Sequence, residues 1–170
     1  MIVIRLINYK NTLIFILLLS LFCFISSLII QVFFKEKPCL LCLFTRYGFL
    51  IISIICLFSI KYIKVKKVVF LPLLPIILMF FFTFYHLGVE NHWWFVPSSC
   101  RTILPTLQDL QSNTFISNES RPPCDKVNFQ IFGISITLIS FIISSFIFWI
   151  YSILLSIYLY SNTINENKEL

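Results

Sequence analysis

This chain has very little charge and very little glycine. Only 12% of its 170 residues are charged and only three are glycine, whereas 59% are hydrophobic. The mean hydropathy is +0.95. A soluble domain of this size has too little interior to bury so much apolar surface, so the bilayer must solvate most of the chain. There is also no internal repeat and no glycine-rich loop of the kind that cradles phosphate.

Four apolar stretches approach the roughly 20 residues that cross a hydrocarbon core. They predict an all-α membrane protein, a four-transmembrane-helix bundle that forms a single membrane domain. The first stretch is too long for a signal-peptide core and has no small-residue cleavage site after it, so we interpret it as a span. Pro72 and Pro75 are expected to kink the start of the third span. Within the domain, residues 1–170, the predicted spans cover residues 13–34, 42–60, 68–87 and 129–160.

The positions of lysine and arginine predict the orientation of the chain in the membrane. Lysine is densest in the short link Lys61–Lys67, and the N-terminal tail adds Arg5 and Lys10. A long loop, about residues 88–128, lies on the opposite side and has no excess of basic residues. Both termini are therefore expected in the cytoplasm. The net charge of +6 reflects this topology, and no nucleic-acid partner is expected.

The six cysteines fall into two groups in this topology. Cys23 and Cys56 lie within spans and are expected to be small core residues. The other four lie on the outer side or at its membrane edge, where an oxidising compartment lets disulfides persist. One close pair and one distant pair fit two disulfides that exchange. These four are Cys39, Cys42, Cys100 and Cys124.

The close pair follows Pro38 at the start of the second span. Cys39 and Cys42 share one face of a helix there and are near enough to join as a disulfide. The positive end of the helix dipole favours the thiolate, the reactive form of cysteine. Arg46 continues the same face, and a guanidinium in an apolar segment needs a partner. The pattern predicts a redox-active thiol pair beside a buried site for a polar group.

Most of the chain resembles the DsbB family of bacterial disulfide-bond formation proteins. The stretch Pro38–Arg46 is similar to the family signature P-C-x-L-C-x-x-x-R. Tyr85–Glu90 and Pro97–Cys100 lead into the outer loop, and Cys124 closes it, in the order of the family. The resemblance implies a multi-pass protein of the bacterial inner membrane with a periplasmic loop. It implies an enzyme that reoxidises a periplasmic DsbA-like thiol oxidase and passes the electrons to the membrane quinone pool, ubiquinone or menaquinone.

The resemblance also implies a catalytic role for each of the four cysteines. Cys100 matches the cysteine that the partner's thiolate attacks, and the freed Cys124 then attacks Cys39. This releases Cys42 as a thiolate that delivers electrons to the quinone. The residues support this order independently, because an apolar quinone needs a donor at membrane depth, whereas exchange with a soluble partner needs an exposed, mobile loop.

Two further residues are predicted to bind the quinone together with Cys42. Arg46 can stabilise the Cys42 thiolate and donate to a quinone oxygen that gains negative charge, or it can snorkel to the outer interface. His86 ends the third span on the same side and either lines the quinone pocket or caps its helix in contact with water. No metal is expected, and a zinc site built from the four cysteines is the alternative.

Other functions are compatible with the same residues. An enzyme like vitamin K epoxide reductase also combines a helical C-x-x-C with loop cysteines, but there the loop pair comes first, whereas Cys100 and Cys124 follow Cys39 and Cys42. A relative that serves one dedicated partner is a variant of the main prediction. A non-enzymatic membrane subunit would use its disulfides only to brace the loop.

Overall fold

The computed structural model describes residues 2–35, 37–63, 65–96, 100, 122–127, 130–131 and 133–166. Most of the predicted long loop lies outside the described residues, including 97–99 and 101–121. Its two cysteines, Cys100 and Cys124, are described.

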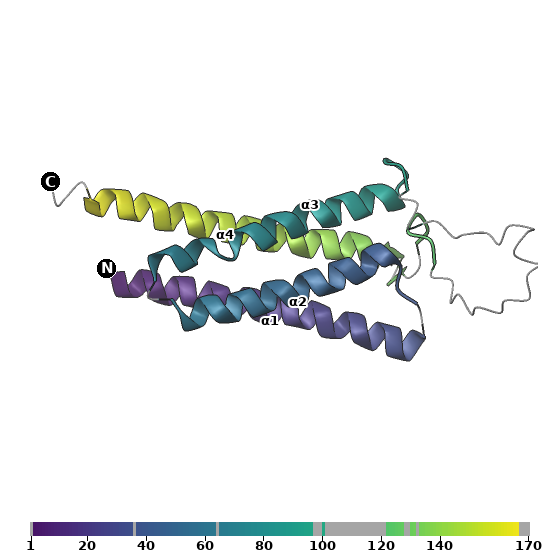
Figure 1. The fold of residues 1–170 in the computed structure, drawn as a ribbon, viewed down its shortest axis with the longest axis horizontal. Coiled ribbons are helices and arrows are strands. Elements are labelled where there is room, and N and C mark those ends of the chain that lie inside the picture. Colours follow the sequence, from purple (N-terminus) through teal and green to yellow (C-terminus); the bar gives the residue numbers. More distant parts are fainter. Residues whose placement is uncertain are drawn as a thin grey trace, which may run out of the picture.

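Four long helices run side by side along the molecule (Figure 1). Each contains a segment long and apolar enough to cross a membrane. This confirms the prediction of an all-α membrane protein with four spans. The helices are α1 (Ile2–Phe34), α2 (Leu40–Lys61), α3 (Leu73–Glu90) and α4 (Ile136–Glu166).

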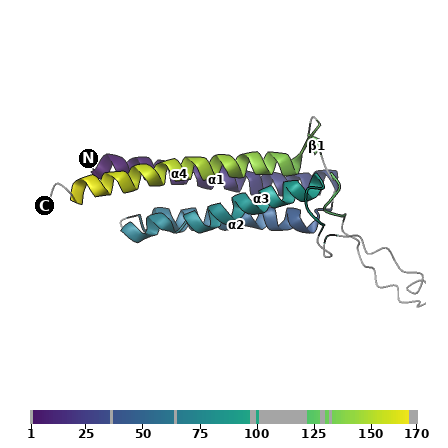
Figure 2. The same cartoon turned by 90° about the horizontal axis from the view of Figure 1, so that it is seen from above.

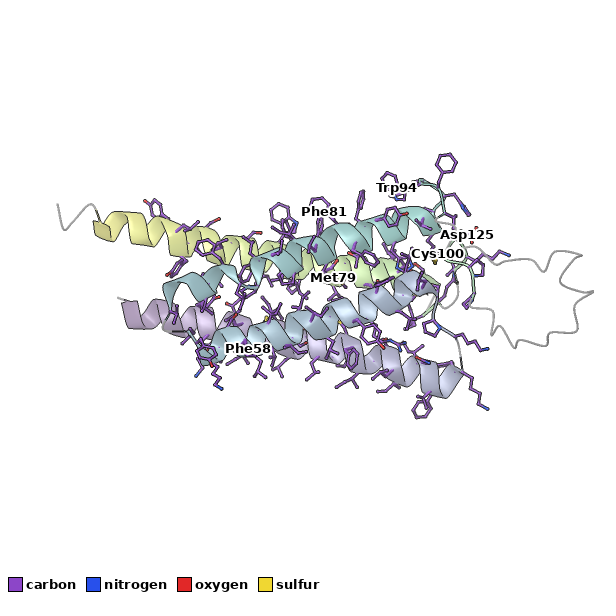
Figure 3. All side chains as sticks on the ribbon, viewed as in Figure 1. Phe58, Met79, Phe81, Trp94, Cys100 and Asp125 are labelled. Atoms are coloured by element: carbon purple, nitrogen blue, oxygen red, sulfur yellow. A yellow bond between two sulfur atoms is a disulfide. The ribbon has the colours of Figure 1, made fainter. Side chains whose placement is uncertain are left out.

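The bundle consists of two helix pairs, because α1 packs most closely on α2 and α3 on α4 (Figure 1). In the view from above, α1 and α4 lie on one side of the bundle and α2 and α3 on the other (Figure 2). Both termini lie at one end of the bundle (Figure 1). Cys100 lies at the other end (Figure 3). Large apolar side chains such as Phe81 point outward from the bundle, whereas Met79 on the same helix points into it (Figure 3).

The interior combines apolar packing with pairs of hydroxyl groups between helices. Cys56 is fully buried in the core, as expected for a small core residue. Ser20 of α1 shares a hydrogen bond of 2.7 Å with Ser53 of α2, and Thr83 of α3 shares one of 2.6 Å with Ser144 of α4. Because lipid tails are as apolar as the core, such small polar contacts add to the packing that holds membrane helices together.

The third span is broken near its start, where a kink was predicted. A short 3-10 helix, η1 (Lys66–Phe70), precedes Pro72, which is the N-cap of α3. Proline lacks the N–H that would continue the backbone hydrogen bonds, so the break falls there. The hydroxyls of Tyr9 and Tyr151 both donate to the carbonyl of Val69, which satisfies this backbone group in the interior.

The fourth helix begins later than the predicted span. A small antiparallel hairpin of β1 (Gln130–Ile131) and β2 (Ile134–Ser135) precedes it, and Gly133 in the turn has a φ of +78°. Positive φ favours glycine, which has no Cβ to clash. Ser135 then accepts a hydrogen bond of 3.2 Å from the N–H of Leu138 and caps α4.

Candidate active site

Cys39 is the N-cap of α2, and the geometry of the helix start presents its sulfur to one backbone N–H group. The N–H of Cys42 donates to Cys39 Sγ at 3.2 Å, and the N–H of Leu43 donates to the Cys39 carbonyl at 3.1 Å. Pro38 therefore lies before the cap and not at the first helical position. A negative charge on Cys39 is stabilised both by this hydrogen bond and by the positive end of the helix.

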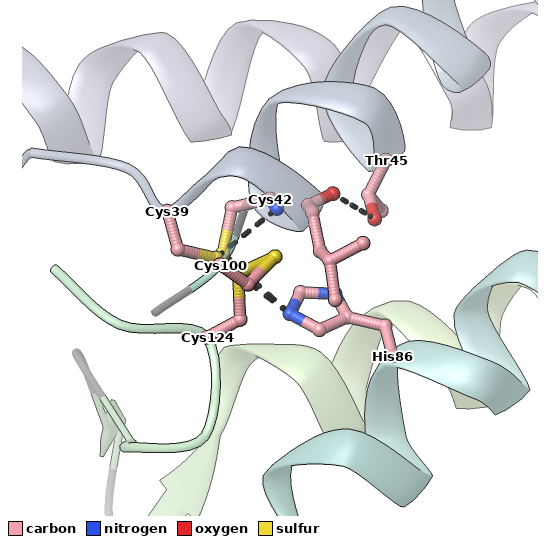
Figure 4. Close-up of a disulfide and its surroundings, with 7 residues drawn as sticks. Cys39, Cys42, Thr45, His86, Cys100 and Cys124 are labelled. Atoms are coloured by element: carbon pink, nitrogen blue, oxygen red, sulfur yellow. Dashed lines mark hydrogen bonds between the residues drawn. A yellow bond between two sulfur atoms is a disulfide. The ribbon is translucent and has the colours of Figure 1, made fainter. Parts of the chain in front are cut away.

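The second thiol of the pair and one histidine face the sulfur of Cys39 (Figure 4). The Sγ atoms of Cys39 and Cys42 lie 2.6 Å apart. His86 of α3 places Nε2 at 3.7 Å from Cys39 Sγ and 3.9 Å from Cys42 Sγ. With only 3% of its surface exposed, His86 is not a helix cap in contact with water. The structure thus brings together three residues that the sequence places on two helices.

These contacts favour negative charge on Cys39. The hydrogen bond with the Cys42 thiol is the largest effect, and His86 and the N–H of Cys42 add to it, so the pKa of Cys39 lies well below its ordinary value. Burial alone would raise this pKa. The geometry therefore favours the thiolate form of Cys39 at the start of the helix. The role of Cys42 as the thiolate that delivers electrons stays a prediction.

The two loop cysteines form a disulfide that packs against this pair. Cys100 and Cys124 are bonded with their Cα atoms 5.3 Å apart, and the N–H of Cys124 donates to the carbonyl of Cys100 at 3.2 Å. They were expected to be exposed, but only 4% and 2% of their surfaces are. They lie in one buried cluster with Cys39, Leu41 and Val89, which places both redox pairs side by side (Figure 4).

Arg46 is buried and held by α1. Its Nε donates to Ser27 Oγ at 2.5 Å, one terminal nitrogen to Gln31 Oε1 at 2.6 Å and the other to the Ser27 carbonyl at 3.2 Å. With 9% of its surface exposed, it bonds across to α1 and does not extend to the outer interface. It also interacts electrostatically with Cys42. Ser27 and Gln31 were missed, although two polar residues one turn apart in an apolar span are a recognisable signal.

A cavity of about 370 Å³ opens beside the thiol pair. Its wall is mostly apolar, with side chains such as Phe22, Phe49 and Ile143. Cys23, expected in the core, also lines it. Volume and lining are typical of sites for small organic molecules, which combine an apolar wall with a few polar groups. The polar and reactive groups at the wall include Cys39, Cys42, Arg46, His86 and Glu90.

The predicted alternative of a four-cysteine zinc site does not fit this arrangement. Cys100 and Cys124 are joined to each other, so they offer no thiolate to an ion. Among the described residues, the group with metal-ligand spacing is Cys39, Cys42 and His86.

A four-span membrane protein with a thiol pair at a helix start and a second disulfide packed on it has the architecture of a membrane thiol oxidoreductase. The family model for disulfide bond formation protein DsbB matches residues 9–155 of the chain. The chain therefore belongs to the DsbB family and is a membrane disulfide-generating oxidoreductase. No curated protein and no solved structure gives a significant match.

Proposed function

We propose that this protein oxidises a periplasmic DsbA-like thiol oxidase and passes the electrons to membrane quinone, either ubiquinone or menaquinone. The observation that carries the proposal is the packing of the Cys100–Cys124 disulfide against Cys39, whose partner Cys42 lines an apolar cavity. One pair thus lies where a loop reaches it, and the other lies within the bundle beside a site for an apolar molecule.

The relay between the pairs is a series of thiol–disulfide exchanges. A thiolate of the reduced partner attacks Cys100, the Cys100–Cys124 bond breaks, and Cys124 leaves as a thiolate. Cys124 attacks Cys39 of the Cys39–Cys42 disulfide, and Cys42 leaves. The partner's second thiolate then attacks its own mixed disulfide, which closes the partner's disulfide and releases Cys100 as a thiolate. Cys100 attacks Cys124 of the Cys124–Cys39 disulfide, the Cys100–Cys124 bond re-forms, and Cys39 leaves as a thiolate. Two electrons and two protons have then moved from the partner to Cys39 and Cys42.

In the structure the loop disulfide is closed, and the sulfur atoms of Cys39 and Cys42 face each other beside it. Burial of Cys100 means that the loop has to open before a partner reaches its sulfur. Once the loop closes again, the cluster of Cys39, Leu41 and Val89 excludes water from the exchanging sulfur atoms.

The residues around the cavity fit a quinone ring. The apolar wall formed by Phe22, Phe49 and Ile143 suits the ring, and hydrogen-bond donors in the same lining, such as Arg46, suit a ring oxygen. Within the part of the chain that the structure describes, the hydrogen bonds to Ser27 and Gln31 use three of the five N–H groups of Arg46, so two can serve a ligand. When bound, a quinone supplies an acceptor for two electrons and two protons.

The protein side chains have separate tasks at this step. Cys39 and Cys42 each give up one electron and form their disulfide, which returns the pair to the state that Cys124 attacks. Arg46 holds positive charge close to Cys42 and to the wall of the cavity. His86, in contact with both sulfur atoms, accepts a thiol proton as the S–S bond forms.

Quinone reduction by the purified full-length protein, supplied with a reduced DsbA-type partner, tests the proposal. Wild-type protein should reduce quinone at a rate that Cys42→Ser abolishes while the helical content stays unchanged. Cys56→Ser, a cysteine change deeper in the same helix, is the matched control and should keep the activity. If wild-type protein reduces neither ubiquinone nor menaquinone, and the loop disulfide resists the reduced partner, the proposal is wrong.

A further inference from the structure

Three donor atoms at the thiol pair have the arrangement of a metal site. The Sγ atoms of Cys39 and Cys42 and a ring nitrogen of His86 all lie within 4.8 Å of one another. Two thiolates and one imidazole form a soft donor set that suits d10 cations. We infer that the reduced pair and His86 together bind Zn²⁺, and that the bound ion blocks turnover. The inhibitory effect rests on the proposed function, whereas binding of the ion does not.

The observed distances are close to those that the ion requires. For Zn–S bonds of about 2.3 Å and Zn–N bonds of about 2.0–2.1 Å in a tetrahedron, sulfur and nitrogen are separated by about 3.6 Å. The distances from His86 Nε2 to the two sulfur atoms are 3.7 and 3.9 Å. The two sulfur atoms, now 2.6 Å apart, have to separate by about 1 Å, which rotation of the half-buried Cys42 side chain into the cavity provides.

The charge of the complex also favours binding at this depth. Two thiolates and one neutral imidazole around a divalent cation give a net charge of zero, which is far less costly to bury than two bare thiolates. Two thiol protons leave as the ion binds, and no electron is transferred. The fourth ligand position faces the cavity, where water can occupy it.

The site exists in one redox state of the protein. When Cys39 and Cys42 form their disulfide, neither sulfur is a thiolate, so the ion has only His86 left. In the reduced state, the ion occupies the sulfur lone pairs that have to form the S–S bond. Zinc therefore holds the enzyme in its reduced form, and removal of the ion by a chelator restores turnover.

Metal binding is measured on the full-length protein in detergent, without quinone and without a partner. Co²⁺ is the first probe, because thiolate ligands give it a charge-transfer absorption, and Zn²⁺ is then added to displace it. The Cys100→Ser/Cys124→Ser background removes the loop thiols that a reductant would release. We expect one ion per reduced chain and no thiolate absorption in the oxidised chain. Because the oxidised and reduced chains have the same sequence, their comparison does not depend on a substitution that could disturb folding.

Variants show which residues hold the ion. His86→Ala and Cys42→Ser should each weaken binding at least about tenfold, in line with the loss of one of three ligands. The exposed His92→Ala and the core Cys56→Ser are matched controls and should leave affinity within about twofold. Equal Co²⁺ spectra in the oxidised and reduced chains, or unchanged binding in His86→Ala, would overturn the inference. Quinone reduction by metal-free protein reports separately on the proposed function.

Discussion

The Nε2 atom of His86 lies 3.7 Å from the sulfur of Cys39, although one residue is near the end of α3 and the other caps the start of α2. This contact joins the two helix pairs of the bundle at the Cys39–Cys42 pair. It gives the N-cap sulfur a third stabilising neighbour, besides Cys42 and the backbone N–H of Cys42. The reactivity of Cys39 should therefore depend on a residue of another helix.

Replacing His86 with Ala should raise the pKa of Cys39 toward its ordinary value. The histidine lowers this pKa in the folded protein, so the thiolate persists at lower pH than in an ordinary cysteine. As pH falls, alkylation of reduced Cys39 should decline through this lowered pKa in wild-type protein and at higher pH in His86→Ala. Mass spectrometry of alkylated peptides over a pH series measures the difference. Identical pH profiles would show that His86 does not act on Cys39, and the exposed His92→Ala is the control.

Arg46→Leu should raise the KM for quinone more than it changes the KM for the partner. The arginine faces the cavity, and a hydrogen bond from a charged group contributes about 1.5–3 kcal/mol, so a rise of about tenfold or more is expected. Gln31→Ala leaves the charge in place but removes one of its anchors, so it should give a smaller rise. Steady-state kinetics with each substrate varied in turn makes the comparison. An unchanged quinone KM in Arg46→Leu would contradict the role given to this residue.

Leu41→Ala should make the loop disulfide easier to reduce. Leu41 is buried against Cys100 and Cys124, and a buried Leu→Ala change costs about 2–5 kcal/mol where the site cannot collapse. The substitution destabilises the state in which the disulfide is packed against Leu41, so a small thiol should reduce the Cys100–Cys124 bond faster. Phe44→Ala, which removes an exposed side chain of the same helix, is the matched control. Equal reduction rates in the two variants would mean that this packing does not protect the disulfide.

Hydropathy predicted the spans, because it reports which segments are apolar enough to lie within the membrane. The break at Pro72 could also be predicted from the sequence, since proline cannot continue the backbone hydrogen bonds. The start of α4 could not be predicted, because Gln130–Ile131 and Ile134–Ser135 are short hairpin strands whose apolar side chains resemble the beginning of a span. Hydropathy does not distinguish a strand at the membrane surface from the helix that follows it.

The sequence indicated which residues are candidates for the site, but it did not indicate which of them contact one another across helices. The C-x-x-C spacing is local to one helix, so pairing of Cys39 and Cys42 followed from the sequence. The contacts of Arg46 with Ser27 and of His86 with Cys39 depend on how each helix is rotated about its own axis. Hydropathy carries little information about that rotation. Burial of the loop disulfide likewise depends on which surface the loop covers.

Gly88→Ala should destabilise the end of α3 more than Gly48→Ala destabilises α2. A Cβ at Gly88 would lie 1.4 Å from Nε1 of Trp94, whereas at Gly48 it would lie 2.5 Å from the flexible Met79 Sδ. The carbonyl of Gly88 accepts a hydrogen bond from the N–H of Trp93 at 2.8 Å, which fixes the backbone of the turn. Because the backbone is held, the indole of Trp94 has to move away to make room for the Cβ. Overpacking of this kind costs about 1–3 kcal/mol.

The two glycine variants are compared by thermal unfolding and by tryptophan fluorescence. Gly88→Ala should lower the Tm and shift the emission of the indole that it displaces, and Trp94→Ala in the same chain should restore the Tm by removing the clash. Gly48→Ala should leave the emission unchanged, because Met79 can move. If Gly88→Ala matches wild type in both measurements, the indole of Trp94 does not rest on this glycine.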